Sequence, residues 1–435
     1  MIVVFVLVAA AVLALLAGVH RYVWRRLIGD TTRKGSLARR AGTVAAFALP
    51  SLSVGALVSS RAGVPFPVQQ VLAWPGYLWL AALLYLTLAL LVGEAARPLL
   101  RRVLARRAGA AGSAAPHTSE APDPAAERVT RSAAPDTGSG TGSTRTDVAP
   151  RPEATAPAVA DPSRRLFVAR AVGGAAAVAG LGTVGYGTYG VLRGPRTKRI
   201  TIPLAGLPRS AHGFRITMVS DIHLGPVLGR AHTRRVVDAI NATSPDLVAV
   251  VGDLVDGSVA DLGSAAEPLA QIEARHGSYF VTGNHEYFSG AAEWVDHVRE
   301  LGLHPLENAR VEVAGFDLAG VNDVAGESEG QGPDFARALG DRDRGRASVL
   351  LAHQPVVIDD AVEYGVGLQL SGHTHGGQLW PGNLVAELAN PTVAGYERYG
   401  DTQLYVSRGA GAWGPPVRVG APSDITVVQL ASPQA

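Results

Sequence analysis

The sequence predicts an α/β domain of two packed sheets that follows a set of apolar membrane helices. Apolar runs of strand length recur through the second half of the chain, and each ends at a Gly-rich or polar loop. Stretches with helical spacing separate some of these runs, which is typical of α/β folds. In the first half, long uncharged apolar stretches alternate with clusters of arginine, as in membrane proteins.

Residues 1–107 contain three candidate transmembrane helices. Residues 1–19, 41–60 and 71–92 carry no charge, and each stretch is long enough to cross a hydrocarbon core of about 30 Å. The first stretch lacks the charged start and the small-residue cleavage site of a signal peptide. We therefore expect it to be retained as a helix.

Residues 108–163 are rich in Ala, Pro, Ser, Thr and Gly and contain no aromatic residue, which predicts a disordered linker. Residues 164–192 hold a fourth apolar stretch. Two interpretations of it stay open. It is either an ordinary membrane helix with basic flanks or a twin-arginine-like export signal in which Arg164 and Arg165 precede a mildly apolar region. Both place the following residues across the membrane.

The basic residues predict an orientation for these helices. The loop after the first stretch is crowded with Lys and Arg, the second loop has only Arg61, and another basic cluster follows residue 92. By the positive-inside rule, the first loop is cytoplasmic and the fourth helix leads outward. We expect a multi-pass protein of the cytoplasmic membrane with an extracytoplasmic last domain, although the basic residues at 193–199 count against this orientation.

Residues 201–430 are predicted to form the α/β domain. The expected strands are residues 214–219, 247–251, 278–281, 348–351 and 367–370, and the expected helices are residues 231–240 and 291–301. Residues 403–406 and 425–430 are expected to be strands of a second sheet. We expect the two sheets to pack face to face with the helices outside.

Five short polar motifs follow the expected strands, where an α/β sheet presents its ligands. They are Asp221-x-His223, Gly252-Asp253-x-x-Asp256, Gly283-Asn284-His285-Glu286, His353 after an apolar run, and Gly372-His373-x-His375. Each motif alone is a weak signal, because turns and helix caps explain single Asp, Asn or His residues. Five motifs in order, each behind an apolar run, indicate a metal-binding site.

The ligand types indicate the chemistry of such a site. Imidazole and carboxylate ligands in a chain without cysteine suit Mn²⁺, Fe²⁺ or Zn²⁺ better than Mg²⁺. Two divalent cations about 3.5 to 4 Å apart clamp the attacking and leaving oxygens of a displacement at phosphorus. Asp253 is suited to bridge them, because Gly252 permits a tight turn after a buried strand.

His285 and Glu286 have separate expected roles. His285 is expected to face the same cavity without binding metal, free to hydrogen-bond a phosphate oxygen or to protonate the leaving oxygen. Glu286 is expected to orient it. The aromatic residues Tyr287, Phe288 and Trp294 form either an apolar wall beside the site or helix-packing contacts.

The five motifs resemble those of the calcineurin-like metallophosphoesterases, and the strings around Asn284 and His373 resemble the membrane-anchored bacterial branch of that family. The resemblance covers residues 201–430. It implies a four-layered α/β/β/α sandwich with its site at the strand ends. It also implies Asn284 and His285 as catalytic residues, and two metal shells bridged by Asp253: Asp221, His223 and His375 in one, and Asn284, His353 and His373 in the other.

The predicted function is therefore that of a membrane-anchored phosphohydrolase with two divalent metal ions. It would cleave a phosphodiester, pyrophosphate or phosphomonoester by attack of a metal-bridging hydroxide, and the resemblance suggests an envelope lipid or polymer as the phosphorylated substrate. The net charge of +2 is too small to indicate a nucleic-acid partner. The alternative is a non-catalytic membrane sensor that binds a phosphorylated ligand at the metal site.

Overall fold

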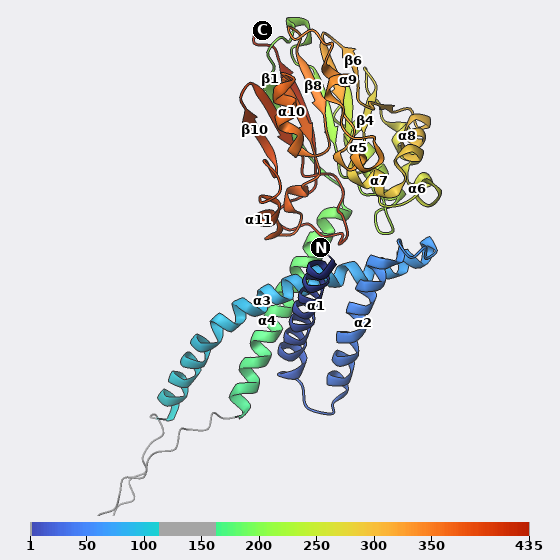
Figure 1. The fold of residues 1–435 in the computed structure, drawn as a ribbon. Helices are drawn as coiled ribbons and strands as arrows, with labels where there is room; N and C mark the ends of the chain where they lie inside the picture. Colours follow the sequence, from blue (N-terminus) through green and yellow to red (C-terminus); the bar gives the residue numbers. More distant parts are fainter. Residues whose placement is uncertain (1, 113–161, 435) are drawn as a thin grey trace, which may run out of the picture.

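The computed structural model describes residues 2–112 and 162–434, which form a set of long helices with an α/β domain at one end (Figure 1). The predicted linker at residues 108–163 lies for the most part outside the described residues. Residues 108–112 continue the third helix, and residues 162–163 begin the fourth.

Four long helices make up the first region. They are α1 (Ile2–Trp24), α2 (Leu37–Ser59), α3 (Phe66–Gly112) and α4 (Pro162–Leu192), and a π-helical turn, η1 (Arg25–Gly29), follows α1. Each of the four has the length and apolar composition needed to cross a membrane. The predicted span at residues 71–92 lies inside the longer α3, which contains two prolines.

Polar contacts join α1, α3 and α4 toward the end of the helices that lies away from the α/β domain. Arg26 Nε lies 2.9 Å from Glu94 Oε1, which joins the end of α1 to α3. Arg170 Nε of α4 donates to Thr31 O in the loop after α1, at 3.0 Å. The first loop and the start of α4 therefore lie side by side.

Two six-stranded sheets form the centre of the α/β domain. The first has the strand order β1-β12-β2-β3-β4-β5, and the second has the order β10-β11-β9-β8-β7-β6. The first sheet consists of β1 (Arg196–Pro203), β2 (Arg215–Val219), β3 (Leu247–Val251), β4 (Ser278–Val281), β5 (His304–Pro305) and β12 (Asp424–Ala431). The second consists of β6 (Ala309–Val313), β7 (Phe316–Gly320), β8 (Ser348–Leu351), β9 (Leu368–Ser371), β10 (Gly395–Tyr399) and β11 (Thr402–Val406).

Apolar side chains fill the space between the sheets. Leu247, Ala249 and Val251 of β3 point into this core, while Val248 and Val250 pack beneath the helices on the outer face. Both faces of β3 are thus buried, as expected for a continuous apolar run in a parallel sheet. The domain has the four layers α/β/β/α that the resemblance implies.

The outer layers are formed by short helices. Those that cover the first sheet are α5 (Arg230–Asn241), α6 (Val259–Ala266) and α8 (Ala291–Glu300), and those that cover the second are α9 (Phe335–Leu339) and α10 (Ile358–Glu363). Two further helices lie at the end of the domain that faces the long helices, α7 (Asn284–Ser289) and α11 (Gly382–Ala386) (Figure 1). The 3₁₀ turns are η2 (Arg209–Ala211), η3 (Glu267–Gln271), η4 (Val324–Glu329), η5 (Pro355–Val357) and η6 (His375–Gly377).

One predicted strand lies in a different sheet from the one expected. The run at residues 403–406 corresponds to β11 of the second sheet, but the run at residues 425–430 corresponds to β12, which lies between β1 and β2 of the first sheet. An apolar run that is buried on both faces shows that it is a strand, but it carries no information about which sheet receives it.

Candidate metal centre

The five motifs meet at the end of the α/β domain that faces the long helices. Because β2, β3 and β4 are parallel neighbours, the loops that follow them leave at one edge and carry Asp221, Asp253 and Asn284. The parallel pair β8 and β9 brings His353 and His373 to the matching edge of the second sheet. Helix α7, which begins at Asn284, marks this end of the domain in Figure 1.

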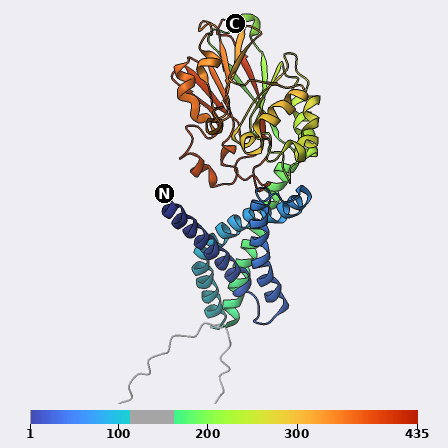
Figure 2. The same cartoon turned by 45° about the vertical axis from the view of Figure 1, so that its right-hand side comes forward.

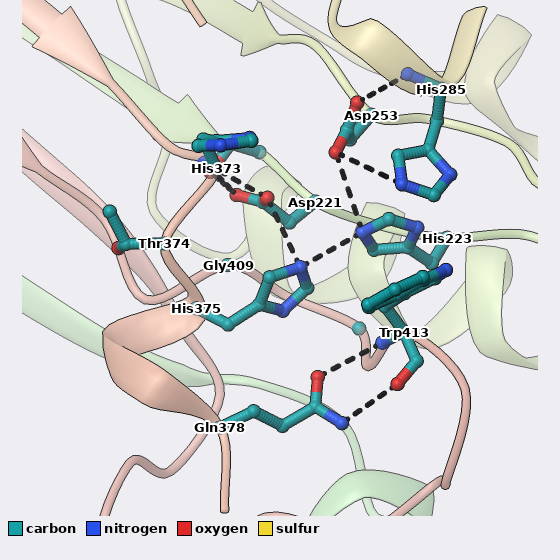
Figure 3. A network of polar contacts seen from close by, with 12 residues as sticks. Asp221, His223, Asp253, His285, His373, Thr374, His375, Gln378, Gly409 and Trp413 are labelled. Atoms are coloured by element: carbon teal, nitrogen blue, oxygen red, sulfur yellow. Dashed lines mark hydrogen bonds and ion pairs between the residues drawn. The ribbon is translucent and has the colours of Figure 1, made fainter. Parts of the chain in front are cut away.

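Six of the seven predicted metal ligands form groups whose ligand atoms lie within 4.8 Å of one another. The groups are Asp221, His223 and His375; Asp253, His353 and His373; and His223, Asp253 and His285. Asp253 Oδ2 lies 3.1 Å from His353 Nε2 and 3.7 Å from His223 Nε2. One carboxylate therefore lies between the two predicted shells, and Figure 3 shows it facing both His223 and His285.

The backbone is strained at most of these positions. Five of the seven predicted ligands have positive φ, which is uncommon for any residue other than glycine. They are Asp221, His223, Asp253, His373 and His375, with φ between 50° and 72°. Strain of this kind persists only where the surrounding structure enforces it, and it is concentrated at functional sites.

Glycines allow the loops to approach the carboxylates closely. A Cβ on Gly283 would lie 2.3 Å from Asp253 Oδ1, and one on Gly372 would lie 2.4 Å from Asp221 Oδ2. Both distances are far shorter than a van der Waals contact, so no larger residue fits. Gly283 is thus required by its close packing against Asp253, and Gly372 by its close packing against Asp221.

Hydrogen bonds orient the ligands. His353 Nδ1 donates to Val251 O at 2.9 Å, so its Nε2 faces Asp253. Ser220 Oγ donates to Asp221 Oδ2 at 2.5 Å, and the backbone N–H of His373 donates to Asp221 Oδ1 at 3.0 Å. Metal-binding histidines and carboxylates are commonly held by such partners.

Asp256 has a role that the sequence did not indicate. Its Oδ1 accepts a hydrogen bond from His223 Nδ1 at 3.0 Å and lies 2.6 Å from His285 Nδ1. It therefore orients both rings with their Nε2 atoms toward Asp253. Asp256 stands in the second motif, but only the fold shows that two histidines from other motifs converge on it.

Glu286 does not orient His285, contrary to the sequence-based expectation. Its carboxylate accepts hydrogen bonds from the backbone N–H groups of Gly283, Asp253 and Leu254, at 2.6, 3.0 and 2.8 Å. Burial and the nearby Asp253 carboxylate raise the pKa of Glu286 to about 7. It ties the loop after β3 to the loop after β4, and Asp256 takes the expected orienting role.

Arg418 is a second group that sequence reasoning missed. It is buried, and its guanidinium donates to His375 O and to Gly411 O, at 3.1 and 2.6 Å. Its Nη2 lies 3.0 Å from His375 Nδ1. No motif contains Arg418, which reaches the site from residues close to the C-terminal strand.

Neighbouring charges and burial keep Asp253 ionised and His373 neutral. Burial alone would raise the pKa of Asp253, but the positive charges of His353 and His223 outweigh burial and lower it. Burial and the charge of His353 lower the pKa of His373 to about 4. An ionised Asp253 and a neutral His373 are the protonation states that bind a metal.

Two polar atoms of the site have no hydrogen-bond partner among the described residues. Asn284 Oδ1 and His373 Nδ1 are both buried and unpaired in this sense. A buried polar atom without a partner is costly, and coordination to a cation would satisfy each of these atoms. The donor set of carboxylate, amide oxygen and imidazole fits divalent cations of the first transition row.

The aromatic residues near His285 divide between the two expected roles. Trp294 is a fully buried residue of α8 and packs in the cluster that joins α6 and α8 to the first sheet, as a helix-packing residue. Phe288 is 74% exposed, and its ring centroid lies 5.5 Å from that of His285. Trp413, which the sequence did not single out, lies 5.6 Å from His285 and is visible beside the site in Figure 3.

Known proteins share the motif-bearing part of this chain. A family model for the calcineurin-like phosphoesterases matches residues 214–377. A transmembrane protein with a metallophosphoesterase domain from Danio rerio is 39% identical over 56% of this chain and 59% of that protein. An uncharacterized metallophosphoesterase from Aquifex aeolicus is 34% identical over 54% of this chain and 91% of its own length.

The match to the Danio rerio protein thus spans less than two thirds of that relative. Among solved structures, a putative 5'-nucleotidase from Staphylococcus aureus is similar with a TM-score of 0.32 and 13% sequence identity. That similarity covers 51% of this chain and 55% of the other.

Proposed function

Because this chain belongs to the calcineurin-like phosphoesterase family, we propose that it is a membrane-anchored hydrolase that cleaves phosphate esters with two divalent cations. The observation that carries this proposal is the pair of adjoining ligand groups that meet at the Asp253 carboxylate. Asp221, His223 and His375 would hold one cation, Asn284, His353 and His373 would hold the other, and Asp253 would contact both. When bound, the cations supply an activated water and neutralise charge on the phosphoryl oxygens.

His285 is positioned to assist the departure of the leaving group. Its Nδ1 lies 2.6 Å from Asp256 Oδ1, so the carboxylate fixes the orientation of the ring. Its Nε2 faces the ligand cluster, 4.0 Å from Asp253 Oδ2. From this position His285 can donate a hydrogen bond to a phosphoryl oxygen or a proton to the leaving oxygen.

The position of the site favours a substrate at the membrane surface. Ala412, next to Trp413, packs with Val191 at the end of α4, and Tyr85 of α3 donates to Trp380 O at 3.0 Å. The loops around the metal centre are therefore in contact with the apolar helices. Such a site suits a phosphodiester, pyrophosphate or phosphomonoester of an envelope lipid or polymer.

The test uses the full-length protein in detergent, stripped of metal with a chelator and then given Mn²⁺. We expect about two metal ions per chain by elemental analysis and turnover of bis-p-nitrophenyl phosphate or p-nitrophenyl phosphate. His285→Asn should lower turnover by roughly 10²- to 10⁴-fold with metal content retained. Asp253→Asn should lower metal content as well.

His304→Asn is the matched control, because His304 is an exposed histidine on β5, outside the site. It should retain wild-type turnover. If the wild-type protein and His285→Asn bind the same amount of metal and neither turns over either compound, the result would contradict the proposed hydrolase. It would favour a sensor of a phosphorylated ligand.

A further inference from the structure

The edge of the α/β domain that carries the metal centre also carries an exposed apolar surface. We call it the apolar rim, and it consists of Phe288, Trp380, Leu384, Val385, Leu388 and Trp413. Their exposed fractions run from 54% for Trp380 to 86% for Leu388. Residues 376–396 contain a single charged residue, Glu387, so few hydrated side chains offset the exposed apolar area of this surface.

We propose that the apolar rim inserts into the lipid headgroup layer of the membrane that α1 to α4 cross. Insertion would place the metal centre at the level of the lipid phosphates. Only the meaning of this placement for catalysis rests on the proposed function. The insertion itself depends on the surface and its position. Isolated exposed apolar residues are common on proteins, but four within residues 380–388, with Phe288 and Trp413 on neighbouring loops, indicate a surface that needs a partner.

The position of the rim selects the bilayer as that partner. Trp380 accepts a hydrogen bond from Tyr85 of α3 through its carbonyl, and Leu379 and Val419 pack against the cluster formed by α1, α3 and α4. Figures 1 and 2 show α11 at the end of the domain that faces these helices. The rim is therefore continuous with a membrane-crossing surface, while Leu384, Val385 and Leu388 remain uncovered by it.

A direct connection joins the rim to the metal centre. Gln378, three residues after His375, donates through Nε2 to Trp413 O at 2.8 Å and accepts through Oε1 from Trp413 N at 3.0 Å (Figure 3). This pair of hydrogen bonds fixes Trp413 beside His285, whose ring also contacts Phe288. A rim held in the headgroup layer would thus set the depth of His285 and its neighbours.

The absence of cysteine from the sequence allows a clean test. A single cysteine is introduced as Leu388→Cys or Val385→Cys in the full-length protein, labelled with the environment-sensitive dye NBD, and reconstituted in phosphatidylcholine–phosphatidylglycerol nanodiscs. Both residues are largely exposed, so the label should not disturb packing. We expect blue-shifted emission, and spin-labelled lipids should quench it because the label lies among headgroups.

Val362→Cys provides the matched control, since Val362 is 39% exposed on α10, away from the long helices (Figure 1). Its label should emit as in water and escape quenching. Water-like emission from both rim positions would overturn the proposal. Blue-shifted emission that lipids do not quench, and that fades on dilution, would also overturn it, because a second copy of the chain would then cover the rim.

The same nanodisc samples separate this inference from the proposed function. Turnover of bis-p-nitrophenyl phosphate with Mn²⁺ reports on the hydrolase alone, because that compound is soluble. Lipid quenching without turnover would support insertion and count against the hydrolase. Turnover with water-like emission at the rim would support the hydrolase and count against insertion.

Discussion

At the scale of single residues, one carboxylate connects the histidines of two motifs. Asp256 contacts the Nδ1 atoms of His223 and His285, at 3.0 and 2.6 Å, and through these two rings it acts on the predicted metal site. It is therefore a positioning residue. Outer partners of this kind typically contribute 10- to 100-fold to activity or metal affinity.

Asp256→Asn should lower kcat by about 10- to 100-fold while KM changes little, because the rings lose their charged partner and the substrate loses no contact. Steady-state kinetics with bis-p-nitrophenyl phosphate measure the two constants separately. Asp296→Asn is the control, since Asp296 is an exposed aspartate of α8 whose only ion pair is with Arg299 in the described part of the chain. A rise in KM at constant kcat would show that Asp256 binds substrate instead.

His232 predicts how the stability of the α/β domain depends on pH. It lies buried in α5, and neither ring nitrogen has a hydrogen-bond partner among the described residues. Burial, together with the positive charges of Arg235 and Arg418, lowers the pKa of His232 to about 3. The unfolded chain, with a histidine pKa of about 6.5, therefore binds more protons than the folded chain between these two values.

Stability should consequently fall as the pH drops below about 6.5, by roughly 1.4 kcal/mol between pH 7.5 and pH 5.5 for this group. His232→Leu removes the titrating ring and should reduce the acid sensitivity by that amount. Thermal unfolding of the full-length protein and the variant at both pH values measures the difference. Equal acid sensitivity of the two proteins would show that His232 is accessible to protons in the folded state.

At the scale of elements, one glycine of α4 sets the contact between the long helices and the metal-site loops. A Cβ on Gly187 would lie 2.7 Å from Val417 Cγ1 and 2.9 Å from Arg418 O. A Cβ on Gly185, two residues earlier, would meet no atom within 4 Å. The two glycines thus form a matched pair on one helix.

Gly187→Val should weaken this contact by about 1 to 3 kcal/mol, because added volume at a filled interface forces the segments apart. A loss of that size lowers the midpoint of thermal unfolding by several degrees in a domain of this length. Gly185→Val should leave the midpoint close to that of the wild type in the same detergent. Equal shifts in both variants would point to a general effect of valine in α4.

The elements also show how far the sequence specifies this fold. The strands that end at motifs are recognisable because their apolar runs are buried on both faces, as in β3. Strand β1 was not recognised, because it is an edge strand in which only Ile202 is buried. The sheet that holds β12 could not be predicted either, since pairing is decided by tertiary contacts.

The candidate site shows the same division between local and tertiary information. The residues in short motifs were identifiable, because turns and caps do not explain so many Asp, Asn and His residues in order. Arg418, Trp413 and the role of Asp256 depend on contacts between segments far apart in the chain, such as that of Arg418 with His375. Glu286 was assigned the wrong partner because adjacent residues of a helix point in different directions.

At the scale of the whole molecule, the arrangement of the helices makes a testable statement about orientation. The loop between α1 and α2 and the start of α4 lie together, at the end of the helices away from the α/β domain. That end carries a high density of arginine, which the positive-inside rule assigns to the cytoplasm. This arrangement predicts that the α/β domain and its metal centre lie outside the cytoplasmic membrane.

Single cysteines test this orientation directly in a chain without native cysteine. In intact bacteria that express the protein, a membrane-impermeant maleimide should label Asp401→Cys in the α/β domain and should leave Lys34→Cys, in the first loop, unlabelled. After the membrane is permeabilised, both should react, because both positions are exposed. The reverse pattern would place the metal centre in the cytoplasm, and the basic residues at 193–199 would then be the cytoplasmic anchor of α4.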